Sequence, residues 1–456
     1  MIKPRLLPGA LALAVGALVA PVGAQQAPRI DYHTFTLDNG LEVVVHEDHS
    51  TPIVAVNLWY DVGSAHEEEG RSGFAHLFEH MLFQETENLD KGQFMSMIPA
   101  AGGSFNGTTN EDRTAYFETL PSNRLNLALW AEAERMARLQ VTAENFQRER
   151  EVVKEERRLR IDNQPYGAAF LTVDTLATDY EPYKHTVIGS MDDLNAATVE
   201  DVTAFYRRYY VPNNATLVVA GDVELAEVRS LVEQYFGGIP RGPEMEPLPA
   251  PSTTPRVDGE RRVVLPDDKA NTPLVMMAYN IPPARHDDAY ALDLLGSILS
   301  QGESSRLYRR LVQEEQAALQ AGGGPDSRVG PGLFTFFALP NQDVSPERIE
   351  ALIEDELRKI REDGVPAREL QKAQNQARAN TIMSRQSVFS KASQLQSARL
   401  YQGDMEAVNT DLARYAEVTV EDIQRVARMY LVPTNRTVVI AVPAEEAPAD
   451  ADEQTT

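Results

Sequence analysis

The sequence TVEDVTAFYRRYYVPNNATLVVA at residues 198–220 returns as TVEDIQRVARMYLVPTNRTVVIA at residues 419–441. The two copies are identical at 12 of 23 positions and are offset by 221 residues. Each copy begins with a threonine followed by acidic residues, which is typical of a helix N-terminus. Each then breaks at a proline and ends in a β-branched run that is typical of a strand. The repeat therefore predicts two halves of similar fold.

The duplication extends beyond this unit, because the same offset pairs TPIV at 51–54 with TPLV at 272–275. Segments with strand-like patterns, such as 41–45 and 53–60, lie beside a long helical pattern at 123–160. We therefore expect an α+β protein with two homologous halves related by a pseudo-two-fold axis. Each half should contain a mostly antiparallel sheet covered by helices on one face.

Composition suggests where the halves begin and end. The first 24 residues have a basic start, an apolar stretch and a small-residue end, which indicates a secretory signal peptide cleaved after Ala24. A retained membrane anchor is the alternative. A proline-rich stretch predicts a stiff linker, and an acidic tail of low complexity predicts disorder. The expected order is signal peptide (1–24), first domain (25–238), linker (239–257), second domain (258–445) and tail (446–456).

Charge and motifs exclude several classes of protein. The chain has 68 acidic and 43 basic residues, and this excess of negative charge disfavours nucleic-acid binding. No GxxxxGK phosphate-binding loop is present, so we expect no use of ATP. After the signal peptide no stretch is long and apolar enough to span a bilayer. The predicted signal peptide therefore indicates a periplasmic or secreted protein.

The motif HLFEH at residues 76–80 lies within a helical pattern. His76 and His80 are four residues apart, so they share one helix face and can bind one metal ion, with Glu79 beside them. The corresponding residues of the second half are Ser297, Ser300 and Gln301. The helical pattern is kept there while the metal-binding side chains are lost. We therefore expect a metal-binding first half and a degenerate second half.

A catalytic zinc ion usually has three protein ligands and one open position. The chain has no cysteine, so the third ligand should be a carboxylate. One stripe at helical spacing consists of Phe146, Glu149, Val152, Val153, Glu156 and Leu159. A carboxylate on such an apolar face is costly unless it is paired or binds a metal. One of Glu149 and Glu156 should therefore bind the metal while the other orients a ligating histidine. The stripe alone leaves both assignments open.

The chain resembles the family of pitrilysin, insulin-degrading enzyme and mitochondrial processing peptidase, which are zinc peptidases with an inverted HxxEH motif. The resemblance covers nearly the whole chain after the signal peptide. It includes GFAHLFEHMLFQET (73–86), GGSFNGTTNEDRTAYF (102–117), EPYKHTVIGSMDDL (181–194) and YYVPNNATLVVAGDV (209–223).

This resemblance implies a role for each residue of the candidate site. His76, His80 and Glu156 would hold one Zn²⁺ per chain, and Glu149 would orient a ligand. Glu79 would act as the catalytic base. An edge strand that pairs with the substrate backbone would include Gly103, Ser104, Phe105 and Asn106.

Some members of the family bind substrate with their second half through an arginine and a tyrosine. Here Arg306 matches the arginine, but Leu319 stands at the tyrosine position. The resemblance thus implies that this chain is the zinc subunit of a heterodimer whose paralogous partner supplies the arginine–tyrosine clamp. A self-sufficient homodimer is the alternative.

The resulting hypothesis is an endopeptidase that cuts small or unfolded peptides inside a clam-shell chamber formed by two subunits. A non-catalytic structural or chaperone-like subunit is the rival, but the zinc-site residues are all retained. A two-metal phosphodiesterase would need more Asp and His ligands than the pattern offers. The substrate, the cleavage preference and the partner's identity stay open.

Overall fold

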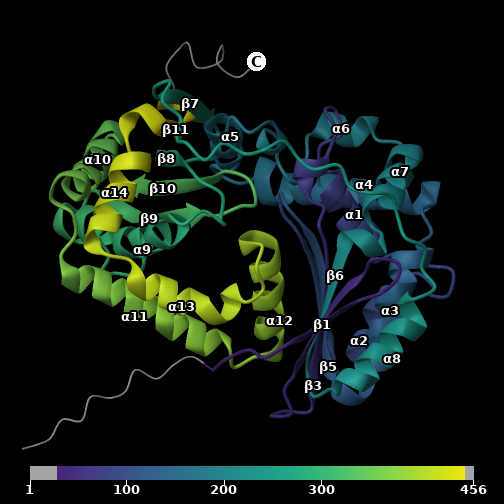
Figure 1. Cartoon of the computed structure of the whole chain (residues 1–456). Helices are drawn as coiled ribbons and strands as arrows, with labels where there is room; N and C mark the ends of the chain where they lie inside the picture. The colour runs from purple at the N-terminus through teal and green to yellow at the C-terminus, as the bar shows by residue number, and fades with distance from the viewer. Residues whose placement is uncertain (1–27, 447–456) are drawn as a thin grey trace, which may run out of the picture.

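The computed structural model of the chain describes residues 28–446, which form two halves side by side (Figure 1). The predicted signal peptide and all but the first residue of the predicted tail lie outside the described residues. The first half contains the strands β1 (His33–Thr36), β2 (Glu42–Glu47), β3 (Ile53–Tyr60), β4 (Ser104–Thr109), β5 (Thr114–Pro121) and β6 (Ala215–Gly221). The second half contains β7 (Arg261–Asp267), β8 (Leu274–Ile281), β9 (Ala318–Asp326), β10 (Gly332–Pro340) and β11 (Arg436–Pro443).

The two sheets share one topology. The strand order is β1-β2-β6-β3-β5-β4 in the first and β7-β11-β8-β10-β9 in the second. The pairs β2–β6 and β7–β11 are parallel, and the remaining pairs are antiparallel. Apart from β1, each strand of the first sheet has a counterpart in the second. The predicted α+β fold with two homologous, mostly antiparallel halves is confirmed.

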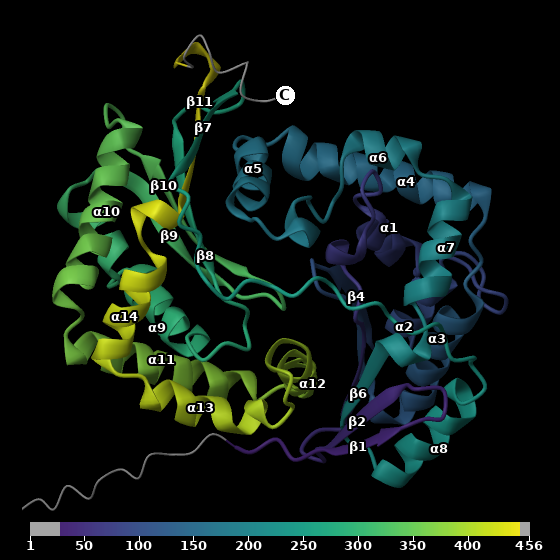
Figure 2. The same ribbon diagram turned by 45° about the horizontal axis from the view of Figure 1, so that its top comes forward.

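The two sheets are covered by helices, most of which lie on the outer faces (Figures 1 and 2). Those formed by the first half of the chain are α1 (Phe74–Met81), α2 (Gln93–Ala100), α3 (Leu125–Arg138), α4 (Ala143–Arg157), α5 (Gly167–Ala177), α6 (Met191–Ala196), α7 (Val199–Tyr209) and α8 (Leu225–Phe236). Those formed by the second half are α9 (Ala289–Ser300), α10 (Pro346–Asp363), α11 (Ala367–Ser384), α12 (Val388–Ser397), α13 (Ala407–Glu417) and α14 (Val420–Tyr430).

The repeated sequence forms the same unit in both halves, α7 followed by β6 and α14 followed by β11. The side chain of Thr198 accepts a hydrogen bond from the backbone N–H of Asp201, at 3.2 Å. Thr419 caps the second copy in the same way through Asp422, at 3.1 Å. Each helix therefore begins at the threonine that the sequence indicated.

The predicted helical stretch 123–160 is two helices, α3 and α4, rather than one. Thr142 interrupts the helical stretch and caps the start of α4. Its hydroxyl accepts a hydrogen bond from the backbone N–H of Asn145, while the Asn145 side chain accepts one from the N–H of Thr142. This reciprocal capping satisfies the N–H groups of a new helix start. The two helices can consequently point in different directions.

The expectation that helices cover one face of each sheet is wrong, because the halves exchange helices. The helix α12 from the second half packs on β3 and β6, and α5 from the first half packs on β8 and β11 (Figure 2). The apolar residues Ala392 and Leu395 of α12 share one buried cluster with Val218 of β6. The central strands are apolar on both faces, so a second layer is needed to bury them. The halves are thereby interlocked.

Residues 239–257 contain no helix or strand, and we propose that they form the linker between domains 25–238 and 258–445. Within residues 28–446, no helix has the length and apolar character needed to cross a bilayer.

Candidate metal centre

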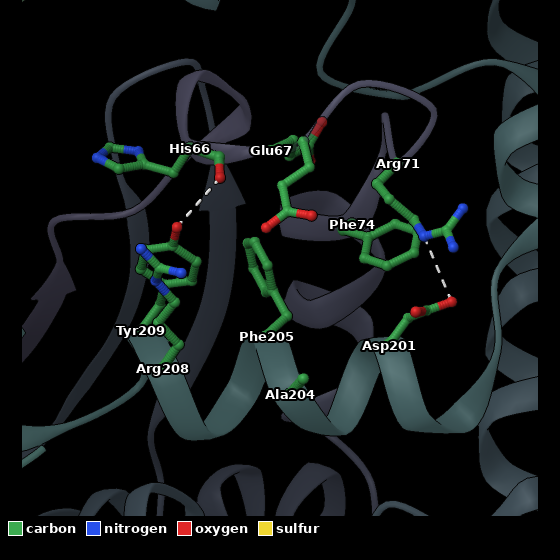
Figure 3. Close-up of a pocket in the computed structure, with 10 residues that line it drawn as sticks. His66, Glu67, Arg71, Phe74, Asp201, Ala204, Phe205, Arg208 and Tyr209 are labelled. Atoms are coloured by element: carbon green, nitrogen blue, oxygen red, sulfur yellow. Dashed lines mark hydrogen bonds and ion pairs between the residues drawn. The ribbon is translucent and has the colours of Figure 1, made fainter. Parts of the chain in front are cut away.

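The start of α1 is fixed by a buried carboxylate. The backbone N–H groups of Gly73 and Ala75 donate to Glu67, at 2.9 and 2.7 Å. The Glu67 side chain is fully buried and points toward Phe74 and Phe205 (Figure 3). Burial raises the pKa of Glu67, whereas the N–H donors oppose this rise. Glu67 thus holds the N-terminus of the helix that carries the HLFEH motif, and the sequence analysis did not single it out.

Close backbone packing also fixes this helix. Gly73 has a φ of 90°, and a Cβ atom there would lie 2.8 Å from the carbonyl oxygen of Ile188. Gly189 is equally confined, since its Cβ would lie 2.4 Å from the carbonyl oxygen of Ser72. Only glycine fits a positive φ at such close approach. Backbone packing therefore fixes the start of α1 independently of the side chains of the HLFEH motif.

Three potential metal ligands converge between α1 and α4. His80 Nε2 lies 3.2 Å from Glu156 Oε2, and His76 Nε2 lies 3.8 Å from the same oxygen. One ligand atom from each residue lies within 4.8 Å of the other two, and no other such group of His, Asp and Glu exists among the described residues. Two imidazoles and one carboxylate are a ligand set that suits a catalytic zinc ion with an open position.

The pKa shifts of His76 and Glu156 suit a cation, whereas burial of His80 is outweighed by its hydrogen bond and charge pairing with Glu156, which raise its pKa. Burial, and then the charge of His80, lower the pKa of His76 to about 4. The hydrogen bond from His80 lowers the pKa of Glu156 despite partial burial. A neutral imidazole and an ionised carboxylate are the forms that bind metal. Arg160, which the sequence analysis did not predict, pairs with the other oxygen of Glu156 at 2.7 Å.

The two glutamates of the α4 stripe take different positions. Glu156 faces Nε2 of His80, whereas Glu149 Oε2 lies 3.9 Å from Nδ1 of the same ring. Glu149 is buried and also pairs with Arg148, at 3.1 Å. The geometry places Glu156 with the two histidines and Glu149 behind one of them.

The prediction that this stripe lies on a core face is wrong for two of its members. Val152 is 44% exposed and Leu159 is 57% exposed. Val152, like Glu149 and Glu156, lines an open cavity. The apolar face of α4 is therefore a cavity wall along part of its length, which periodicity cannot distinguish from a core face.

Glu79 is held by the strand opposite α1. Its carboxylate accepts a hydrogen bond from the hydroxyl of Thr109 on β4, at 2.7 Å. Burial raises the pKa of Glu79, and the hydrogen bond from Thr109 opposes the rise. A Cβ atom on Gly107 would lie 3.1 Å from Cγ of Glu79, so strand and helix are in close contact. The sequence analysis identified neither Thr109 nor Gly107 as a neighbour of Glu79.

Among residues 28–446, the strand β4 is the last strand of its sheet and pairs only with β5, so its other edge has no strand partner there. The cavity beside it has a volume of about 870 Å³ and is lined by Asn106, Glu79 and the three potential ligands. The other predicted substrate-binding residues lie differently. Gly103 precedes the strand, Ser104 is exposed at its start, and Phe105 packs against Phe83 and Phe94.

The second half lacks a comparable site within the part of the chain that the structure describes. Ser297, at the position of His76, donates to Gln301, at the position of His80, at 2.6 Å. Arg306 does not line the cavity at His76 and instead donates to Glu369 at 2.7 Å. Leu319 lies on the edge strand β9 and is 62% exposed.

Comparisons with known proteins agree with this architecture. Residues 42–188 match the family described as insulinase (peptidase family M16), and residues 196–377 match the peptidase M16 inactive domain. The chain is 34% identical over 414 residues to the zinc protease PqqE of Helicobacter pylori, covering 90% of this chain and 93% of that protein.

Solved structures share the fold. The crystal structure of a protease from Helicobacter pylori has a TM-score of 0.85 and 33% identity, and the match covers 91% of this chain and all of that one. The periplasmic protease PqqL of Escherichia coli has a TM-score of 0.73 at 20% identity, covering 93% of this chain and 50% of that one. This chain therefore belongs to peptidase family M16.

Proposed function

We propose that the chain is a zinc-dependent endopeptidase whose zinc ion is held by His76, His80 and Glu156. The observation that carries the proposal is the convergence of these three side chains next to Glu79 and the free edge of β4. When bound, zinc would activate a water molecule and polarise the scissile carbonyl group. The naming of relatives as zinc proteases supports the choice of metal.

Glu79 would act as the base and then as the acid. Its carboxylate takes a proton from the water that attacks the carbonyl carbon, and returns it to the amine nitrogen as the C–N bond breaks. Burial favours the uptake of this proton because it disfavours the charged carboxylate. Thr109 holds one oxygen of Glu79, which limits its rotation.

The substrate class follows from the strand edge and the cavity. An extended peptide can add to the free edge of β4 through backbone hydrogen bonds, which requires no particular side chain. A folded domain has few such free segments, so small or unfolded peptides are favoured. Asn106 lines the cavity next to this edge and would contact the peptide.

We propose that the chain works as the zinc subunit of a paralogous pair whose two subunits enclose the substrate. Arg306 donates a hydrogen bond to Glu369, and Leu319 stands at the position where a tyrosine is expected. A partner that supplies both groups would complete the clamp. A self-sufficient homodimer is the alternative, which the activity of the chain alone would favour.

A non-catalytic subunit is the rival function. The match to the inactive domain of the family falls mainly on the second half, which lacks the metal-binding residues. The first half retains all of them in one place, and this weighs against the rival. We further propose a periplasmic or secreted location from the sequence of residues 1–24, in keeping with a fold shared with a periplasmic protease.

The proposal is tested by hydrolysis of a fluorogenic, unfolded peptide. Glu79→Gln should retain zinc and lose activity by orders of magnitude, because the amide cannot accept the proton. Retained turnover at full zinc content would exclude Glu79 as the base. Activity that survives complete removal of zinc by a chelator would exclude the metallopeptidase.

A further inference from the structure

The turn between β4 and β5, residues 110–113, is held by both halves of the chain. Within the first half, the carbonyl oxygens of Asn110 and Glu111 accept hydrogen bonds from the N–H groups of Ser64 and Ala65, at 3.1 and 2.9 Å. From the second half, the hydroxyl of Tyr401 accepts a hydrogen bond from the Asn110 side chain at 2.8 Å. The turn is thus a junction between the halves.

The centre of this junction is the buried carboxylate of Asp112, which is 3% exposed. One oxygen accepts a hydrogen bond from the hydroxyl of Tyr183 at 2.5 Å, and the other from the backbone N–H of Val329 at 2.9 Å. The same hydroxyl of Tyr183 accepts a hydrogen bond from the N–H of Gly330 at 2.8 Å. Asp112 and Tyr183 therefore hold two consecutive N–H groups of the β9–β10 turn in the second half.

A buried arginine completes the junction. Arg328 is 5% exposed and lies 3.2 Å from the carboxylate of Glu111, with its guanidinium 5.3 Å from the centre of the Tyr183 ring. A buried cation is stable only when paired in this way. A Cβ atom on Gly330 would lie 2.8 Å from the Tyr183 ring, so the fit allows little displacement. We call Asp112, Tyr183 and Arg328 the clasp.

The clasp is connected to β4 through two residues, Arg113 and Thr109. Arg113 donates to the carbonyl oxygen of Thr108 at 2.7 Å and packs over Trp59 at 4.8 Å. Thr109, directly before the turn, donates to Glu79. A shift of the turn therefore moves the end of β4 and the hydroxyl that holds Glu79. The potential zinc ligands lie on α1 and α4, whereas the clasp residues lie in the β4–β5 turn, in residues 181–183 and in the β9–β10 turn.

We propose that the second half, although it lacks metal-binding residues, positions β4 and thereby Glu79 through this clasp. Asp112, Tyr183 and Arg328 are positioning residues, and their role rests on the proposed peptidase function. The degenerate half would thus have a positioning role within its own subunit, separate from any contact that it makes with substrate. It follows that loosening the clasp should impair turnover without releasing zinc.

The test compares Asp112→Asn and Tyr183→Phe with the wild type in the zinc-loaded chain. The control is Asp179→Asn, which removes a different ion pair between the halves, that of Asp179 with Arg261 at 2.6 Å. Hydrogen–deuterium exchange is measured over residues 104–113, together with zinc content and peptide turnover. Tyr183→Phe removes a single hydroxyl and serves if Asp112→Asn does not fold.

Both clasp variants should exchange faster in residues 104–109 and lose about tenfold in kcat/KM at unchanged zinc content. The control should match the wild type. Unchanged exchange and turnover in folded clasp variants would overturn the inference, as would an equal effect of Asp179→Asn. Zinc-dependent turnover of the wild type tests the proposed function, whereas the exchange rates test the clasp, so the two can fail separately.

Discussion

The hydroxyl of Thr109 on the edge strand β4 donates a 2.7 Å hydrogen bond to the carboxylate of Glu79 on α1. The two residues are 30 positions apart in sequence, and the bond connects the strand proposed to bind substrate with the proposed base. A peptide that pairs with β4 is therefore aligned against the same strand that orients Glu79.

Replacing Thr109 with valine should lower kcat by about 10–150-fold, because a hydrogen bond to a charged group contributes about 1.5–3 kcal/mol. Valine keeps the shape of threonine, so the fold and zinc content should be unchanged. Thr109→Ser retains the hydroxyl and should recover most of the activity. Steady-state kinetics of both variants provide the measurement, and a fully active Thr109→Val enzyme would show that this bond has no catalytic role.

The two glutamates of α4 should respond differently to substitution. Glu156→Gln should lose most of its zinc because Glu156 faces both histidines. Glu149→Gln should weaken zinc binding or activity only about 10–100-fold, since it contacts the far side of the His80 ring. Zinc titration of the two variants ranks them, and the opposite ranking would identify Glu149 as the ligand.

Removal of the carboxylate that holds the start of α1 should destabilise the fold. Glu67→Ala leaves the buried N–H groups of Gly73 and Ala75 without their acceptor, at a cost of about 2 kcal/mol or more in the free energy of unfolding. The neighbouring Glu69 is exposed, so Glu69→Ala is a matched control. Denaturant unfolding of the two variants should differ clearly, and equal stability would mean that Glu67 does not hold the helix.

The chain alone should cleave peptides poorly even when loaded with zinc, because Leu319 stands where a clamping tyrosine is expected. Addition of a paralogue with the arginine–tyrosine pair should raise the rate by positioning the peptide. Leu319→Tyr should recover a measurable part of that gain in a fluorogenic peptide assay. Full activity of the lone wild-type chain, unchanged by a partner, would favour the homodimer.

Sequence alone could predict those features that depend on short spacings or on repetition. The duplication at residues 198–220 and 419–441 gave the two-half fold, and the i, i+4 spacing placed His76 and His80 on one helix face. Long-range contacts could not be predicted in this way. Glu67 reads as one of three consecutive acids, and Thr109 as part of a polar hairpin.

The exchange of α5 and α12 between the halves could not be predicted for the same reason. Amphipathic helices show which face is apolar but not which sheet that face covers. The prediction of a core-facing stripe from Phe146 to Leu159 was wrong for a related reason, since Val152 lines a cavity and Leu159 is exposed. The roles of His76, His80 and Glu156 as zinc ligands stay a prediction, although the structure brings their side chains together.

The central claim is most directly tested by the zinc content of the purified wild type and of His76→Ala, His80→Ala and His33→Ala. His33 lies on β1, away from the cavity at His76, and controls for adventitious binding by histidine. We predict about one zinc ion per chain in the wild type and in His33→Ala, and nearly none in the other two, because two protein ligands do not hold a catalytic zinc tightly. Stoichiometric zinc in His80→Ala would contradict the account.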